Sequence, residues 1–180
     1  MGLFDPKAGP EPPPVHQITP HLDTSEIRCR CGCQYGMFPG EFSPDLAEDF
    51  EALREKMNEE HFPDGPEQGL TVSSGCRCHK HNRNMKPQGH PRSHHLRGTA
   101  IDIHPPEDVT SLELAALALT IPRLKKGGIG LYDWGLHLDH GRKARWGAWP
   151  ETPRTKPKTK APEKKKPEPK KGEDNGDGEG

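Results

Sequence analysis

The two ends of this chain are too rich in proline and charge to build a packed core, which confines any fold to the middle. Residues 1–16 contain five prolines and predict an extended segment. Residues 151–180 hold nine Lys or Arg interspersed with prolines, and their last eight residues include four acids. Such segments bury too little apolar surface to offset the entropy lost on ordering. We therefore expect disordered tails at both ends and one folded domain at residues 17–150.

The apolar content of the whole chain is low. Only 29% of the residues are hydrophobic, and adding the 20 glycines still leaves the chain below the roughly 45 to 50% of ordinary domains. The sequence contains no run of about 18 apolar residues, so no membrane span is predicted. The first residues lack the basic and then apolar pattern of a secretory signal. We expect one modest core in a soluble protein that is made in the cytoplasm without an export signal.

Three segments of the middle region predict regular elements. Residues 43–54 place three apolar side chains on one helical face, with Ser43 as the N-cap and Pro44 at the first helical position. Residues 110–120 predict a second helix, because Thr110 and the glutamate three positions later match a capping box. Residues 70–74 predict a short strand.

Two further segments predict strands with apolar residues on one face and metal-binding residue types on the other. In residues 100–104, the isoleucines alternate with Asp102 and His104. In residues 133–139, one face holds Trp134, Leu136 and Leu138, and the other holds Asp133, Gly135, His137 and Asp139. Imidazoles and carboxylates on the polar faces of two strands indicate a lined cleft.

The densest chemistry lies between Ser93 and Asp102, which read S-x-H-x-x-G-x-A-x-D. This stretch offers His95 and Asp102 as ligands, and Gly98 permits a tight turn between them. His137 is the natural candidate for a third ligand. Two histidines and one carboxylate would leave a fourth tetrahedral position for water, as in catalytic zinc sites.

Other histidines compete for the metal. His94 precedes the chosen ligand, His104 shares a strand face with Asp102, and His140 comes close after His137. We interpret all three as ordinary polar residues, because they are out of register with the motif.

Five cysteines form two clusters, Cys29, Cys31 and Cys33 in the first and Cys76 and Cys78 in the second. An odd number leaves at least one thiol unpaired if all bonds are internal. Free thiols or one disulfide fit the sequence better than a second, thiolate-bound zinc, because the spacing is C-x-C rather than C-x2-C. All three states stay open at this point.

Four ordered motifs resemble the zinc D-Ala-D-Ala peptidases of family M15, in particular its small wall hydrolases. They are Val72 to Asn82, Ser93 to Asp102, Gly128 to Tyr132, and Gly135 to Asp139 followed by Ala144-Arg-Trp146. The resemblance implies an α+β domain of the hedgehog/DD-peptidase type, with a small antiparallel sheet and flanking helices that carries one Zn²⁺.

The resemblance also implies roles for individual residues. It makes His95, Asp102 and His137 the zinc ligands. It places Arg77 near the substrate carbonyl or carboxylate. Ser93 would hydrogen-bond the substrate or cap the turn, and Asn82 is a weaker candidate for substrate binding that is also compatible with a turn.

Amide hydrolysis also needs a general base, and here the sequence departs from better understood relatives. Those carry an acid or a histidine two or three positions before the last ligand, where this chain has Trp134 and Gly135. Asp139 is our first choice and Asp133 the second, since both are predicted on the strand face of His137. Asp139 fits equally well as a partner that orients the His137 imidazole.

Together these features predict a monomeric zinc metallopeptidase that hydrolyses peptidoglycan stem peptides or crosslinks, as a D,D-carboxypeptidase or endopeptidase. Without an export signal, it would reach the cell wall by phage-type release or as part of a virion. The alternative is a non-catalytic, zinc-containing wall-binding module of the same fold. The Lys-rich tail predicts weak contact with polyanions, but charge alone does not predict specific nucleic-acid binding.

Overall fold

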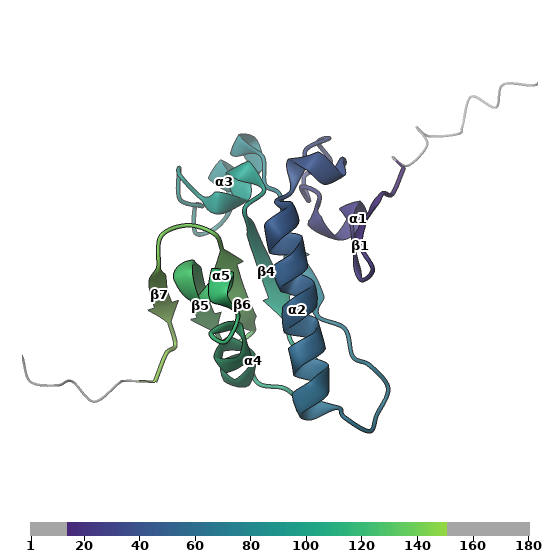
Figure 1. Cartoon of the computed structure of the whole chain (residues 1–180). Coiled ribbons are helices and arrows are strands. Elements are labelled where there is room, and N and C mark those ends of the chain that lie inside the picture. The colour runs from purple at the N-terminus through teal and green to yellow at the C-terminus, as the bar shows by residue number, and fades with distance from the viewer. Residues whose placement is uncertain (1–13, 151–180) are drawn as a thin grey trace, which may run out of the picture. The chain divides into compact units, whose positions relative to one another are not determined.

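A computed structural model describes residues 14–150 of the chain (Figure 1). Residues 1–13 of the predicted N-terminal tail and the whole predicted C-terminal tail, residues 151–180, lie outside the described residues. The helices are α1 (Thr24–Ile27), α2 (Pro44–His61), α3 (His79–Asn84), α4 (Ser111–Ala118) and α5 (Pro122–Lys126), with short 3-10 helices η1 (Pro39–Glu41) and η2 (His94–Arg97). The strands are β1 (Gln17–Thr19), β2 (Leu22–Asp23), β3 (Thr71–Ser74), β4 (Ala100–His104), β5 (Gly128–Tyr132), β6 (Gly135–Asp139) and β7 (Ala144–Gly147). The predicted α+β class is confirmed.

The main sheet has the strand order β3-β4-β6-β5-β7, and β1 and β2 form a separate hairpin. The first four strands of this order pair antiparallel, as expected, but β7 pairs parallel to β5. After β6 the chain reverses direction and passes the end of β5. It then forms β7, which pairs with the edge of β5 that faces away from β6. Because β5 itself runs opposite to β6, β7 and β5 share a direction, and the sheet is mixed rather than wholly antiparallel.

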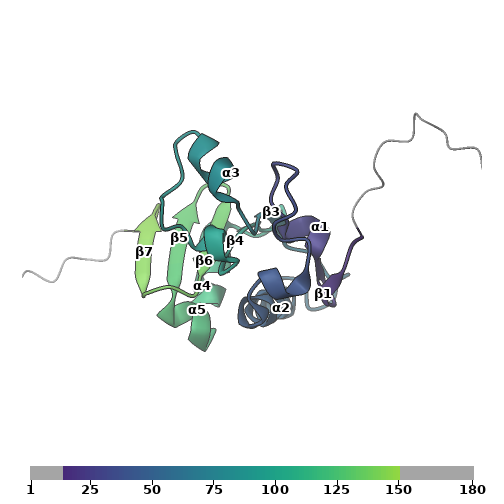
Figure 2. The same cartoon turned by 90° about the horizontal axis from the view of Figure 1, so that it is seen from above.

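Helices cover one face of this sheet, as Figures 1 and 2 show for α2, α4 and α5. The Ser43 side chain accepts a hydrogen bond from the Leu46 amide and starts α2, which continues to His61, seven residues beyond the predicted end. The predicted capping box of Thr110 and Glu113 starts α4. Both N-caps are confirmed, since each satisfies backbone amides that have no partner inside the helix.

The core lies between these helices and the sheet. Its fully buried members from the two central strands are Ile101, Ile103, Leu136 and Leu138, and α2 contributes Leu46, Phe50 and Leu53. Burial of these side chains removes apolar surface from water and is the main stabilising term. The opposite faces of β4 and β6 are therefore free to carry polar side chains, and Figure 2 shows α3 on that side.

The predicted strand at residues 133–139 is two residues too long. The observed β6 begins at Gly135, and Asp133 and Trp134 form the two-residue turn that connects it to β5. Gly135 has a φ of +153°, and any side chain there would collide with the backbone carbonyl of Ile103. Trp134 is 43% exposed and stacks on Tyr132, with ring centroids 4.8 Å apart, instead of joining the apolar face.

Candidate metal centre and active site

The register between β4 and β6 brings two of the predicted ligands together. Asp102 and His137 lie directly opposite each other in this antiparallel pair, and their side chains share one face. Their functional groups meet with Nδ1 of His137 2.7 Å from Oδ1 of Asp102. The alternation of apolar and polar residues on each strand therefore places a carboxylate and an imidazole side by side.

The third predicted ligand comes from the turn that precedes β4. His95 lies on η2, and Gly98 ends that helix in the left-handed conformation, with a φ of +63°. A side chain at Gly98 would meet the Glu41 carbonyl, so the predicted need for glycine at this turn is confirmed. Nε2 of His95 lies 3.2 Å from Nδ1 of His137 and 3.2 Å from Oδ2 of Asp102.

Both imidazoles are oriented by contacts at their other ring nitrogen. Nδ1 of His95 lies 2.6 Å from the carbonyl oxygen of Gly75, which can only accept, so this nitrogen carries the proton and Nε2 is free to bind a metal. Nε2 of His137 lies 3.1 Å from Oδ2 of Asp139. Carbonyls and carboxylates in these positions are the usual partners of metal-binding histidines.

The donor set fits a divalent metal ion. The ligand atoms of His95, Asp102 and His137 all lie within 4.8 Å of one another, and His95 is only 2% exposed. Two nitrogens and one carboxylate oxygen are the ligands of open, tetrahedral zinc sites. The structure thus brings together the three residues that the sequence favoured.

Charges are strongly coupled within this group. Burial raises the pKa of Asp102, but hydrogen bonds from His137 and His95 outweigh it and hold the pKa far below its usual range. Burial disfavours a charge on His137, yet Asp102 and Asp139 raise its pKa to about 9. Burial lowers the pKa of His95. The two carboxylates therefore favour positive charge at His137, and a divalent metal ion bound there would supply such charge.

Arg77 lies beside the same carboxylate. Its Nη2 is 3.0 Å from Oδ2 of Asp102 and 2.9 Å from Oγ of Ser74, and the residue is only 6% exposed. Burial lowers the pKa of Arg77, and Asp102 opposes that shift. The guanidinium thus lies beside the group formed by His95, Asp102 and His137, where its expected role near the substrate requires it. Its direct ion pair, however, is with Asp102, a predicted ligand. That role stays a prediction.

The two candidates for the general base are placed very differently. Asp139 is 5% exposed, and its carboxylate accepts hydrogen bonds from Nε2 of His137 and, at 2.6 Å, from the Gly141 amide. It therefore contacts the ring nitrogen on the far side of His137 from Asp102. Asp133 is exposed in the turn before β6. These contacts favour Asp139 as the partner that orients His137.

The two residues expected to bind substrate lie on opposite sides of a loop that follows α3. The Asn82 side chain is buried on α3 and donates to the carbonyl of His90, while its backbone carbonyl accepts from the Gly89 amide. Asn82 thus holds this loop, which gives its substrate role no support. Ser93 is partly exposed next to η2, and its side chain makes no capping bond to that helix. Substrate binding by Ser93 stays a prediction.

The competing histidines have other partners. Nδ1 of His94 lies 3.0 Å from Oγ1 of Thr99, and its Nε2 lies 3.8 Å from Oδ1 of Asp139. The ring of His104 packs against Trp134. Nε2 of His140 lies 2.8 Å from Oδ2 of Asp49, a buried carboxylate on α2. None of the three belongs to the His95 group.

A cleft of about 320 Å³ opens beside the metal group. Its lining comprises Arg30, Ser73, Ser74, Arg77, His81, Met85, Asp102, His104 and Trp134. Sequence reasoning missed the serines of β3, His81 and Met85, although alternation along residues 70–74 could have indicated one of the serines. It also missed the Gly75 carbonyl, because a backbone acceptor leaves no trace in the residue type.

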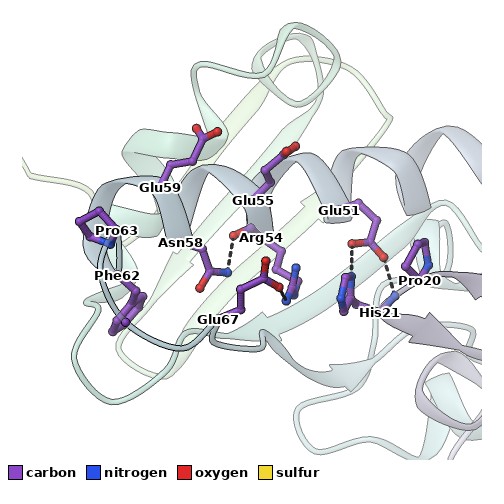
Figure 3. A pocket seen from close by; sticks show the side chains of 11 residues that line it. Pro20, His21, Glu51, Arg54, Glu55, Asn58, Glu59, Phe62, Pro63 and Glu67 are labelled. Atoms are coloured by element: carbon purple, nitrogen blue, oxygen red, sulfur yellow. Dashed lines mark hydrogen bonds and ion pairs between the residues drawn. The ribbon is translucent and has the colours of Figure 1, made fainter.

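A larger hollow of about 640 Å³ lies elsewhere, along α2 and the loop after it (Figure 3). Its side chains mainly pair with one another, as in the contacts of Glu51 with His21 and of Arg54 with Glu67. It contains no residue of the metal group, so the smaller cleft is the candidate active site.

The fold and this site define an α+β protein with a histidine and aspartate group suited to a catalytic metal. Comparison with protein families matches residues 20–139 to the family described as Peptidase M15. The chain belongs to this family and is a peptidase. A search of curated proteins gives no match. Among the described residues, no helix is long and apolar enough to cross a membrane.

Proposed function

We propose that this peptidase hydrolyses amide bonds in the stem peptides or crosslinks of peptidoglycan, with one zinc ion held by His95, Asp102 and His137. The observation that carries the proposal is the convergence of these three side chains beside a cleft that Asp102 itself lines. When bound, zinc would supply Lewis-acid polarisation of the scissile carbonyl and a water of lowered pKa. Both a D,D-carboxypeptidase and an endopeptidase are compatible with this cleft.

The cleft residues suit a substrate that carries carboxylates. Arg77 brings a buried guanidinium to the wall formed by β3 and β4, and Ser73 and Ser74 add hydroxyl groups along the same edge. A guanidinium recognises a carboxylate by strong, charge-assisted hydrogen bonds. Stem peptides end in such groups, so we assign Arg77 to the binding of a substrate carboxylate or carbonyl oxygen.

We further propose that Asp139 acts through His137 and not directly on water. Its carboxylate accepts from Nε2 of His137, which leaves Nδ1 facing Asp102 and His95. Asp139 is thus a positioning residue, because it fixes both the proton and the orientation of a predicted ligand.

Purified full-length protein should release free amines or D-Ala from cell-wall sacculi, and a chelator should stop the release until zinc is restored. His95→Ala should abolish hydrolysis together with metal binding by His95, Asp102 and His137. His21→Ala is the control, since its imidazole pairs with Glu51 of α2 away from this group, and it should retain both. Intact sacculi after incubation with the zinc-loaded protein would contradict the proposed activity.

Asp139 variants test the positioning role. Asp139→Asn keeps an acceptor for Nε2 of His137 and should retain most of the activity, whereas Asp139→Ala should lose about 10- to 100-fold in metal affinity. A general base would behave differently, since both variants would lose roughly 10²- to 10⁴-fold in kcat with unchanged metal affinity.

One observation favours the second candidate, a non-catalytic wall-binding module. Among the described residues of the group, Asp102 is a predicted ligand and Asp139 is bound to His137, so neither carboxylate is free to take a proton from water. Stoichiometric zinc and binding to sacculi without any product would support this candidate over the peptidoglycan hydrolase.

A further inference from the structure

Four of the five cysteines converge at a second place in the molecule. Cys29, Cys31 and Cys33 come from the loop that follows α1, and Cys78 caps the start of α3. Their sulfur atoms all lie within 4.8 Å of one another. The two segments are far apart in the sequence, so the fold alone brings this group together. Cys76 is outside it and is buried in the core.

The spacing of the sulfur atoms suits a shared metal ion. Sγ of Cys31 lies 3.4 Å from Sγ of Cys29 and 3.5 Å from Sγ of Cys78. A disulfide needs about 2.05 Å, and all four thiols are free. Four sulfurs at the corners of a tetrahedron, each about 2.3 Å from a central zinc, lie about 3.8 Å apart.

Hydrogen-bond donors surround the sulfurs. The backbone amide of Cys78 donates to Sγ of Cys29 at 3.3 Å, and the amide of His81 donates to Sγ of Cys78 at 3.3 Å. Nδ1 of His81 lies 3.3 Å from Sγ of Cys29. Such donors stabilise negative charge on sulfur and orient the sulfur atoms as ligands.

The loop that carries three of these cysteines has little buried apolar surface. Residues 28–38 contain no helix or strand, and only Cys29 and Gly36 among them are buried. A segment with so few apolar contacts gains little stability from the core. Small domains commonly compensate for such segments with a disulfide or a structural metal.

We propose that Cys29, Cys31, Cys33 and Cys78 bind a structural Zn²⁺ ion as four thiolates, separate from the His95 group. Each thiol gives up its proton to solvent as it binds, and no electron transfer is involved. Four protein ligands close the coordination sphere, so this site leaves no position for water or substrate. Its role is to join the loop after α1 to the start of α3.

This site would also support the cleft. Cys78 follows Arg77, whose guanidinium pairs with Asp102. It also caps α3, from which His81 reaches the cleft. The ion would therefore fix one wall of the active site without touching the substrate.

The experiment uses full-length protein purified anaerobically in zinc-containing buffer. We expect two zinc ions per chain in the wild type and one in His95→Ala. Cobalt-loaded His95→Ala should show an intense thiolate-to-cobalt charge-transfer band, which nitrogen and oxygen ligands do not produce. Compared with the wild type, Cys78→Ser should bind one metal ion fewer, and its cobalt-loaded form should lack this band. Cys76→Ser, the matched control outside the group, should keep both.

A measurement on the wild type avoids variants that fail to fold. Cys31 is exposed in the structure, so its alkylation, mapped by mass spectrometry, should be fast in the metal-free protein. Added zinc should slow it at least tenfold. Equal alkylation with and without zinc, or a disulfide within the four cysteines, would overturn the proposal. Neither result would affect the proposed hydrolysis, which is read from sacculi and from His95→Ala.

Discussion

His137 lies between two carboxylates, and the two contacts have different consequences. Asp102 faces the ring nitrogen that also meets His95, whereas Asp139 faces the opposite nitrogen. Exchange of these contacts would turn the metal-facing nitrogen away from Asp102. In the proposed site, metal binding therefore depends on ring orientation as well as on residue type, and the buried carboxylate of Asp139 is the contact that would set this orientation.

Tyr35 connects the cysteine loop to the turn that carries His95, and it predicts an alkaline loss of stability. Its hydroxyl donates to the carbonyl of Leu96 at 3.0 Å. Burial, with smaller contributions from Cys76 and Glu41, raises the pKa of Tyr35 from 10.0 to about 12. The unfolded chain thus loses this proton at lower pH than the folded protein. The contribution of Tyr35 should be complete below pH 10 and should decline from there to about pH 12.

Urea denaturation midpoints on either side of pH 10 measure this decline. Tyr35→Phe has no titrating hydroxyl and should show a shallower loss of stability over the same range. An identical pH dependence in both proteins would show that Tyr35 does not carry the effect.

At the scale of elements, the site depends on the pairing register of β4 and β6. A slip of one residue would move Asp102 or His137 to the apolar face, because side chains alternate along a strand. The buried isoleucines and leucines of the two strands oppose such a slip, since it would expose them. The apolar face therefore fixes the alignment of the ligands on the polar face.

A substitution at the N-cap of helix α4 tests the apolar face of the sheet, against which this helix packs. Thr110 caps the helix with its hydroxyl and pairs with the Glu113 carboxylate. Thr110→Ala leaves a helix-terminal amide without this partner and should lower the free energy of unfolding by about 1 kcal/mol. Metal content should not change, because α4 packs against the face of the sheet opposite the ligands. Chemical denaturation and metal analysis measure both quantities.

Ser111→Ala is the control for this prediction. It alters the next residue but leaves the capping box in place, so stability should change by less than about 0.5 kcal/mol. Equal destabilisation by the two variants would argue against a specific capping contribution.

For the whole molecule, the core and both groups proposed to bind metal lie within residues 22–139. Deletion of residues 153–180 should therefore leave the hydrolysis of a soluble stem peptide within about twofold of the full-length rate, since it removes no residue of the core or of the candidate site. The deletion should also weaken binding to anionic wall polymer when binding is measured at low salt, because the deleted segment carries nine positive charges. Steady-state kinetics and sedimentation with sacculi measure these two effects. A large loss of peptide hydrolysis would show that the domain extends beyond residue 150.

Much of the local structure and the three expected ligands could be predicted from the sequence. Local rules predict the bounds of β4, the N-caps of α2 and α4, and the turn at Gly98. Helix caps, strand alternation and left-handed turns all involve residues that are close in the chain. The third ligand, His137, was predicted from the strand-face pattern and from the resemblance to family M15. The match over residues 20–139 shows that the chain belongs to this family.

Other features were decided by the tertiary structure. The parallel pairing of β7, the contact of Asp139 with the far nitrogen of His137, and the convergence of Cys78 with the cysteines of the first loop all join distant segments. The C-x-C spacing argued against a thiolate metal site, yet the ligand distances depend on the path of the loop and the position of α3. Residue types and local spacing determine which groups are available, whereas long-range packing determines which of their atoms meet.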